Sequence, residues 1–247
     1  MARVRMFAGP NGSGKTTLFR TLAKEHSPGG VFNGEPFVNA DDIDAELRAS
    51  RELKLVRYGI SPTQEELSAW LRTAAWSDDT LRLGDHARVA DGVITIAGET
   101  PSSYLAAQFA GFIRSRLLEA GRSFSFETVM SHPGKITLLQ NARAQGFRTY
   151  LYFVATDNVE LNVRRVQVRV QVGGHAVPEQ KIRERYRRSL ELLPQAVRET
   201  DRAFLFDNST ESHVLIAEAT GGKLAQLHVS DAEAPAWFLR SRAALQE

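Results

Sequence analysis

The sequence contains no cysteine and has few lysines. Without thiols, the chain has no disulfide, no thiolate zinc site and no cysteine nucleophile. It also lacks an apolar run of the roughly 18 residues that a membrane helix needs. The first apolar segment begins at Val4, which leaves no room for a signal peptide before it. We therefore expect a cytoplasmic protein without a membrane partner.

The basic residues are mostly arginines, 25 against 6 lysines, in a chain whose net charge is only +2. Eight basic residues lie between positions 164 and 188: Arg164, Arg165, Arg169, Lys181, Arg183, Arg185, Arg187 and Arg188. The planar guanidinium group suits bidentate contact with phosphate. The density alone leaves three interpretations open: a solvated surface, a nucleic-acid site, or a site for nucleotide phosphates.

What the chain does have is a phosphate-loop motif. Gly9 to Thr16 match G-x-x-x-x-G-K-[ST], between an apolar segment at 4–8 and an expected helix at 17–25. Such glycines let backbone N–H groups turn towards phosphates, while Lys15 reaches the β- and γ-phosphates and the hydroxyl of Thr16 ligates Mg²⁺. The motif predicts binding of a nucleoside triphosphate with Mg²⁺ by Gly9, Pro10, Asn11, Gly12, Ser13, Gly14, Lys15, Thr16 and Thr17.

Five short apolar segments predict strands, at residues 4–8, 36–40, 123–126, 149–155 and 203–206. Helical patterns lie between them. This alternation is typical of an α/β fold, here a P-loop NTPase with a mostly parallel sheet of about five strands and helices on both faces. Further helices are expected at 102–120, 135–145, from Pro178 onwards and in the tail at 231–247.

Two of these assignments rest on local signals. For the helix at 102–120, Thr100 is the expected N-cap, Pro101 the first residue and Gly121 the end. The segment 161–172 is ambiguous, because its alternating valines suggest a strand. Asp157 followed by Glu160 resembles a capping box, so we favour a helix that puts Arg165 and Arg169 on one side.

Residues 46–100 form an interval longer than a crossover between parallel strands needs. A helix is expected after Ser61 and Pro62, and Asp91-Gly92 predicts a hairpin. We interpret the interval as a subdomain inserted over the mouth of the sheet. We therefore expect the whole chain, 1–247, to be a single P-loop domain.

Acidic residues follow two of the expected strands, at the edge where open α/β sheets bind ligands. Asp41 and Asp42 follow the second strand and Glu127 follows the third. Phosphoryl transfer to a hydroxyl needs a carboxylate that accepts the proton. Asp41 suits that role, and a role as helix N-cap equally well. Glu127 is either a carboxylate that holds the magnesium water or a plain strand-end charge.

Taken together, the motifs resemble the zeta-toxin family of P-loop kinases. The resemblance rests on GPNGSGKTT at 9–17, FVNADDI at 37–43, SFSFETVMS at 123–131 and the arginine-rich block at 162–189. It runs along nearly the whole chain outside the insertion. It implies an ATP-dependent kinase that phosphorylates a hydroxyl of a small metabolite, which for the best-known members is UDP-N-acetylglucosamine.

The resemblance also implies roles for individual residues. Asp41 is the expected general base, with Asp42 as the fallback, and Glu127 with Thr128 is expected to hold the acceptor. A lid at about 164–188 supplies Arg165 and Arg169, with Arg185 and Arg188 behind them, around a flexible turn at Gly173-Gly174. His175 is expected to position or cap rather than catalyse. The family precedent of an antitoxin that covers the ATP site makes such a protein a candidate partner.

Two departures from the family pattern leave the acceptor open. Val129 stands where toxins acting on UDP-N-acetylglucosamine carry a hydroxyl residue, and the insertion at 46–100 changes the roof of the acceptor pocket. Two other function classes remain as alternatives, a nucleic-acid 5′-kinase and a regulatory NTPase switch. The small net charge, and the lack of aromatics among the arginines, argue against nucleic acid.

Overall fold

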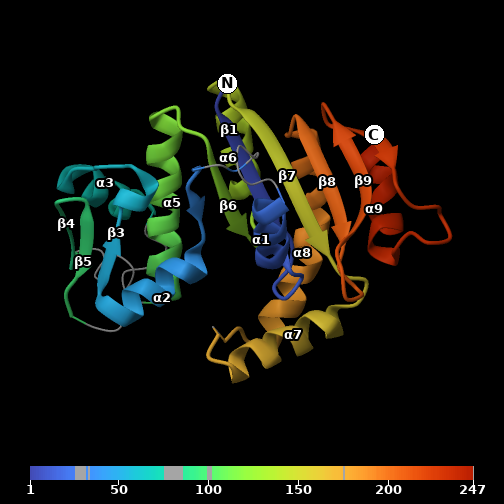
Figure 1. The fold of residues 1–247 in the computed structure, drawn as a ribbon, viewed down its shortest axis with the longest axis horizontal. Coiled ribbons are helices and arrows are strands. Elements are labelled where there is room, and N and C mark those ends of the chain that lie inside the picture. Colours follow the sequence, from blue (N-terminus) through green and yellow to red (C-terminus); the bar gives the residue numbers. More distant parts are fainter. Residues whose placement is uncertain (26–31, 33, 75–85, 99–101, 175, 247) are drawn as a thin grey trace. The chain divides into compact units, whose positions relative to one another are not determined.

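The computed structural model describes residues 1–25, 32, 34–74, 86–98, 102–174 and 176–246 (Figure 1). They form two compact units. The first consists of Met1–Gly34 and Ser125–Glu247, and the second of Glu35–Phe124. The second unit contains the expected insertion at 46–100 and extends beyond it on both sides.

The first unit is built on a sheet whose strands run in the order β10-β9-β8-β7-β1-β6. Their bounds are β1 Arg3–Ala8, β6 Phe124–Thr128, β7 Arg148–Ala155, β8 Arg202–Asp207, β9 Val214–Thr220 and β10 Lys223–Leu227. Strands β1, β7 and β8 are parallel, whereas β9 and β10 extend one edge in antiparallel pairing. The predicted α/β fold with a mostly parallel sheet is confirmed, and the sequence analysis missed β9 and β10.

The central strands are buried on both faces, as near-continuous apolar sequence predicts. All residues from Val4 to Ala8 are fully buried. Phe7 on β1, Tyr152 on β7 and Phe204 on β8 are register partners, and their rings stack with centroids 4.6 Å and 5.1 Å apart. This row of stacked rings lies at matching register positions of the three parallel strands, so their carboxyl ends lie along one edge of the sheet.

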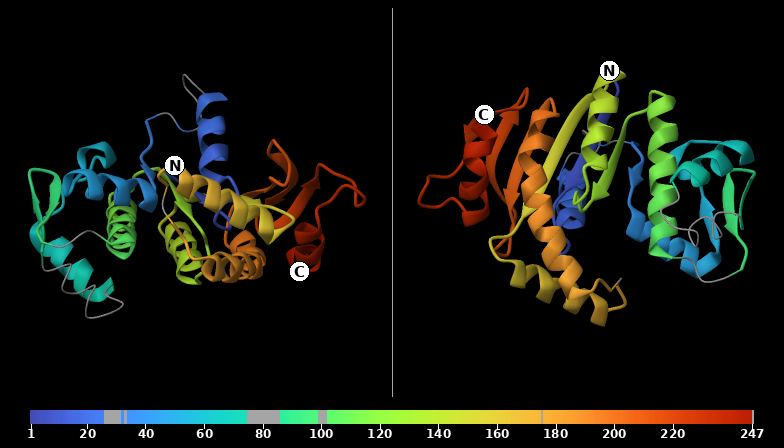
Figure 2. Two further views of the ribbon diagram at one scale, coloured as in Figure 1. Left: turned by 90° about the horizontal axis from the view of Figure 1, so that it is seen from below. Right: turned by 180° about the vertical axis from the view of Figure 1, so that it is seen from behind.

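Five helices belong to the first unit: α1 (Lys15–Glu25), α6 (Gly134–Ala144), α7 (Val159–Gln171), α8 (Glu179–Arg198) and α9 (Ala236–Gln246). Figure 2 shows α1 on one face of the sheet and α6, α8 and α9 on the other. Helix α9 confirms the helix expected in the tail, and Trp237 and Phe238 on it are buried.

The ambiguous segment at 161–172 is helical, as the favoured interpretation held. Its N-cap is Asn158, whose side chain accepts a hydrogen bond from the N–H of Glu160, whereas Asp157 is not the cap. The valines fall on two sides of the helix. Val163 and Val166 pack against Ile182 of α8, while Val168 and Val172 are 60% and 81% exposed. The alternation of valines therefore reflects no strand.

The second unit comprises β2 (Phe37–Val38), α2 (Ala40–Ser50), β3 (Glu52–Lys54), the 3₁₀ turn η1 (Val56–Tyr58), α3 (Gln64–Ala74), β4 (Ala87–Ala90), β5 (Val93–Ile96) and α5 (Ser103–Glu119). Strands β3, β5 and β4 form a small antiparallel sheet. The predicted hairpin is confirmed, with Asp91 and Gly92 both at positive φ between β4 and β5.

Helix α5 begins later than the sequence suggested. Its N-cap is Ser102, whose hydroxyl accepts a hydrogen bond of 3.2 Å from the N–H of Leu105. The expected cap, Thr100, was therefore wrong, because the hydroxyl nearest the first free N–H groups belongs to Ser102. Thr100 and Pro101 themselves lie outside the described residues.

Candidate functional site at the phosphate loop

The phosphate-loop motif joins the buried strand β1 to helix α1, in the order that the sequence predicted. All three glycines of the loop have positive φ, Gly9 at 138°, Gly12 at 74° and Gly14 at 97°. A Cβ atom at Gly12 would lie 2.6 Å from the carbonyl oxygen of Asn162, and one at Gly14 would lie 2.2 Å from Nδ2 of Asn208. Only glycine satisfies both the backbone conformation and these close approaches.

Two polar groups of the loop, on Ser13 and Lys15, suit an anionic ligand. The side-chain hydroxyl of Ser13 is fully buried and has no hydrogen-bond partner among the described residues. Buried polar atoms without partners are rare in proteins and indicate a missing ligand or water. The ammonium group of Lys15, 5% exposed, donates to the carbonyl of Pro10 at 2.8 Å, which keeps the cation at the loop.

Glu127 near the end of β6 lies against the start of α1. The hydroxyl of Thr16 donates to Oε2 of Glu127 at 2.6 Å, and Nζ of Lys15 is 3.7 Å from Oε1. The Glu127 side chain is 13% exposed. A hydroxyl and a carboxylate side by side are oxygen donors of the kind that Mg²⁺ prefers. The structure thus brings together Lys15, Thr16 and Glu127, three of the residues singled out from the sequence.

Three polar side chains that the sequence analysis missed bind the backbone of the loop. Asn162 of α7 donates through Nδ2 to the carbonyl of Asn11 at 2.6 Å, and Asn208 donates through Nδ2 to the carbonyl of Ser13 at 2.7 Å. Nε2 of His213 lies 3.1 Å from the carbonyl of Gly14. Asn208 directly follows β8, and a polar residue at a strand end is the signal that could have found it. Asn162 and His213 carry no such signal.

His213 and Arg165 lie close enough to influence each other. Burial lowers the pKa of His213, and the charge of Arg165 lowers that pKa further, while the hydrogen bond to Gly14 acts in the opposite direction. The imidazole is therefore uncharged at neutral pH. In the tautomer with the proton on Nε2, this nitrogen donates a hydrogen bond to the carbonyl of Gly14.

The first of the predicted lid arginines is engaged with backbone. Arg165 donates from Nη1 to the carbonyl of Asn208 at 2.8 Å and from Nη2 to the carbonyl of Thr210 at 3.3 Å. Burial lowers its pKa, and the nearby charge of Asp207 opposes that shift. Arg169 lies one turn further along α7 and is partly buried.

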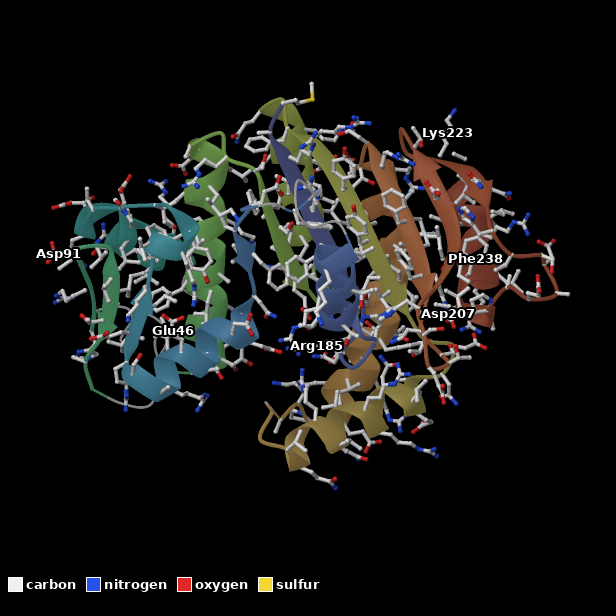
Figure 3. The ribbon with its side chains drawn as sticks, viewed as in Figure 1. Glu46, Asp91, Arg185, Asp207, Lys223 and Phe238 are labelled. Atoms are coloured by element: carbon white, nitrogen blue, oxygen red, sulfur yellow. The ribbon has the colours of Figure 1, made fainter. Side chains whose placement is uncertain are left out.

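Most arginines of α8 form ion pairs on an exposed surface. Arg183 pairs with Glu160 and Glu179, Arg187 with Glu191, and Arg188 with Glu184. The hydrogen bonds that Arg183 donates to Glu160 and Glu179 raise the pKa of its guanidinium. Arg185 differs from them, since it is partly buried and makes no hydrogen bond or ion pair within the described part of the chain (Figure 3).

The acidic pair after β2 belongs to the second unit. Asn39 caps α2, because its side chain accepts a hydrogen bond of 2.9 Å from the N–H of Asp41. The alternative role of Asp41 as N-cap is therefore wrong. Asp41 and Asp42 both lie exposed in the first turn of the helix.

The other predicted residues are placed as follows. In the first unit, the hydroxyl of Thr128 accepts a hydrogen bond from the N–H of Met130 at 3.1 Å, in the turn after β6. Val129 is partly exposed in the same turn. Gly173 has the positive φ of 89° expected for the turn after α7, and His175 lies outside the described residues.

Comparison with known proteins adds the following. No protein-family model matches the chain. A stretch of 63 residues is 32% identical to an uncharacterized protein of Haemophilus influenzae, over 26% of this chain and 45% of that protein. A chain of the AvrRxo1-ORF1:-ORF2 complex with ATP superposes with a TM-score of 0.53 and 18% identity, over 94% of this chain and 61% of that one. The same complex with sulphate ions gives 0.52 over 99% and 75%.

The chain shares the fold of these AvrRxo1 chains. A chain of the PezAT toxin-antitoxin system of Streptococcus pneumoniae aligns with a TM-score of 0.48 and 13% identity, over 99% of this chain and 85% of that one. At such identities the likeness shows the fold alone, and the chain spans about three-fifths of the AvrRxo1 chain solved with ATP. Among the described helices, none has the length and apolar character that crossing a bilayer demands.

Proposed function

We propose that this protein is a P-loop kinase of the zeta-toxin type. It transfers the γ-phosphoryl group of ATP to a hydroxyl of a small metabolite. The observation that carries the proposal is the contact among Lys15, Thr16 and Glu127 at the mouth of the phosphate loop. It joins a cation, a metal-ligating hydroxyl and a carboxylate, which are the groups that phosphoryl transfer requires around a bound triphosphate. The hydroxyl of Ser13 is a further buried donor of the loop, without a hydrogen-bond partner among the described residues.

Thr16 and Glu127 are the residues that would hold Mg²⁺, Thr16 directly and Glu127 directly or through water. The ion, when bound, neutralises charge on the β- and γ-phosphate oxygens. Of the two interpretations of Glu127, its 2.6 Å contact with Thr16 supports the metal role. Its role towards the acceptor, which the resemblance to zeta toxins implies, has no contact of this kind behind it.

Asp41 is our candidate for the general base. Its carboxylate is exposed, and the cap of α2 is already supplied by Asn39. In the proposed step, the carboxylate takes the proton of the acceptor hydroxyl as that oxygen attacks the γ-phosphorus. The bond from the γ-phosphorus to the bridging oxygen breaks, and ADP leaves. Asp42, its neighbour, is the fallback.

Arg169 and Arg185 are our candidates for the groups that offset the charge on the transferring phosphoryl group. Arg185 has no acidic partner within the described residues, whereas Arg183, Arg187 and Arg188 are neutralised by glutamates. Arg165 is less suited to this role, because two backbone carbonyls already take its guanidinium.

The acceptor we propose is a sugar nucleotide, UDP-N-acetylglucosamine or a close relative, bound with the help of Thr128. A protein of this kind acts as a zeta-type toxin, and an antitoxin is its expected partner. The support is the resemblance in the sequence blocks, and Val129 argues for a shifted acceptor. Three of the eight basic residues in the cluster, Arg183, Arg187 and Arg188, are paired with glutamates at the surface of α8, which weakens the nucleic-acid alternative.

A substitution at Glu127 separates its two roles. We expect Glu127→Gln to raise the Mg²⁺ concentration needed for half-maximal ATP turnover by about tenfold or more, because a neutral amide is a poorer ligand for a hard cation. A rise in the KM of the acceptor at unchanged Mg²⁺ dependence would assign Glu127 to the acceptor instead. The assay is steady-state kinetics with UDP-sugars, NAD and short oligonucleotides as acceptors.

A further inference from the structure

We infer that Asn162, Asn208 and His213 form a brace that turns the peptide groups of the phosphate loop towards the nucleotide. We further infer that Arg165 is a positioning residue that ties α7 to this brace. The inference rests on the nucleotide-binding part of the proposed function and says nothing of the acceptor.

The brace holds three carbonyl groups of the loop from outside. Its side chains donate to the carbonyls of Asn11, Ser13 and Gly14. In a trans peptide the C=O of one residue and the N–H of the next point in opposite directions. Fixing these three carbonyls therefore directs the N–H groups of Gly12, Gly14 and Lys15 to the opposite side. Convergent N–H groups of this kind form an anion-binding nest.

The members of the brace are themselves held in place. Asn162 is fully buried, and its Oδ1 accepts a hydrogen bond from the hydroxyl of Thr156. Asn208 is 8% exposed, and its own N–H donates to the carbonyl of Ala155 at 2.8 Å. The bond from Thr156 fixes which end of the Asn162 amide faces the loop, and the bond to Ala155 holds the backbone of Asn208. Two separate segments, α7 and the residues between β8 and β9, thus converge on the loop.

Gly12 and Gly14 make the close contact possible. The Cβ distances at these two glycines show that any larger residue would collide with Asn162 or Asn208. The motif glycines are consequently needed on the outer side of the loop as well as on the phosphate side.

Arg165 extends the brace to the segment after β8. Its two hydrogen bonds to the carbonyls of Asn208 and Thr210 span three residues of that segment. Lysine cannot reproduce this fork, because an ammonium group offers its donors from a single point. The consequence is that Arg165 acts on the nucleotide through Asn208 rather than on the reacting phosphoryl group.

The test measures binding of Mg²⁺·ATP and of inorganic tripolyphosphate by calorimetry. Tripolyphosphate lacks adenosine, so its affinity depends on the phosphate loop alone. Asn208→Leu and Asn162→Leu remove a donor at nearly constant volume and add no charge. We expect each to weaken both ligands by about tenfold to a hundredfold, the cost of one lost bond to a buried polar group. Asn141→Leu, at an exposed asparagine of α6, is the matched control and should bind like the wild type.

A rescue variant, and separate measurement of Kd and kcat, distinguish a positioning role from a role in folding stability alone. His213→Gln keeps an N–H donor and should retain more affinity than His213→Phe. Arg165→Ala and Arg165→Lys should raise the Kd of ATP by a similar factor of about three to ten, with kcat of the saturated enzyme preserved. Melting temperatures without ligand report any loss of folding for every variant.

Several outcomes would overturn the inference. Wild-type affinity for both ligands in the two leucine variants, with only a lower melting temperature, would reduce the brace to a stability element. A fall of kcat in Arg165→Ala at unchanged Kd would return Arg165 to the transition state. A wild type that binds neither ligand would refute the brace and the proposed function together. A wild type that binds ATP through the brace but phosphorylates no acceptor would refute the proposed function alone.

Discussion

The phosphate loop and the outer surface of α8 are both rich in polar side chains, yet they use them in opposite ways. Around the loop, Asn162 and Asn208 are buried and bind backbone carbonyls. On α8, Arg187 and Arg188 are exposed and pair with glutamates one turn away. Exposed pairs of this kind contribute about 0.3–0.5 kcal/mol each. The comparison teaches that the burial of polar side chains and the direction of their hydrogen bonds locate a site. The density of charged residues along the chain does not.

The largest expected effect follows from Lys15→Ala. The variant loses the fixed cation of the loop, so ATP binding and turnover should fall to background. Lys24→Ala, at the exposed end of the same helix, is the control and should leave both unchanged. Nucleotide calorimetry and a phosphate-transfer assay measure the two quantities. Unaltered ATP affinity together with unaltered turnover in Lys15→Ala would place the nucleotide elsewhere.

The next effect concerns the base. Asp41→Asn should lower kcat by about 10²–10⁴ with ATP affinity intact, because the amide cannot accept the hydroxyl proton. Asp42→Asn is its natural control, since the two residues share the exposed first turn of α2. A larger loss in Asp42→Asn would show that the neighbour is the base.

A third prediction sharpens the contrast between the arginines. Arg185→Ala and Arg169→Ala should each lower kcat/KM by about 10²–10³, below the full contribution of an arginine finger. Arg187→Ala removes an exposed residue paired with Glu191 and should change kcat/KM less than about twofold. Equal effects of the three substitutions would show that Arg169 and Arg185 do not differ in function from a surface arginine paired with glutamate.

The smallest effect is a dependence of stability on pH. The folded state lowers the pKa of His213 through burial, so the unfolded chain binds the proton more readily. Stability should therefore fall as the pH drops below about 6.5, the ordinary value for histidine, and should stay constant above it. His213→Gln should flatten this dependence in urea titrations at pH 5 to 8. An unchanged slope in that variant would assign the pH dependence to other groups.

The sequence predicted those parts of the molecule that depend on local pattern. The phosphate loop and the Asp91-Gly92 hairpin follow from glycine positions and turn residues, and both are present. The favoured helix at 161–172 is present too, although its cap is Asn158 and not the expected Asp157. The sequence could not single out the N-cap residues of the helices. Thr100 and Ser102, or Asp41 and Asn39, are all residue types that cap helices well. Only the backbone geometry shows which side chain reaches the free N–H groups.

The brace could not be predicted from local sequence patterns. Asn208 and Ser13 are 195 positions apart, so their contact depends on β8 lying beside β7 and β7 beside β1. The same holds for Glu127 and Thr16, 111 positions apart. A strand-end carboxylate could be noticed in the sequence, but its pairing with Thr16 required the sheet order.

The central claim is that the loop serves phosphoryl transfer to a hydroxyl of a small metabolite rather than to a nucleic-acid 5′ end or to water. The most direct measurement is to incubate the protein with ATP, Mg²⁺ and a panel of UDP-sugars, NAD and short oligonucleotides, and to search every product by mass spectrometry. The account predicts a gain of one phosphate on a hydroxyl of a UDP-amino sugar or similar metabolite, lost in Lys15→Ala and Asp41→Asn. Phosphate appearing only on oligonucleotide 5′ ends, or only as free phosphate, would contradict it.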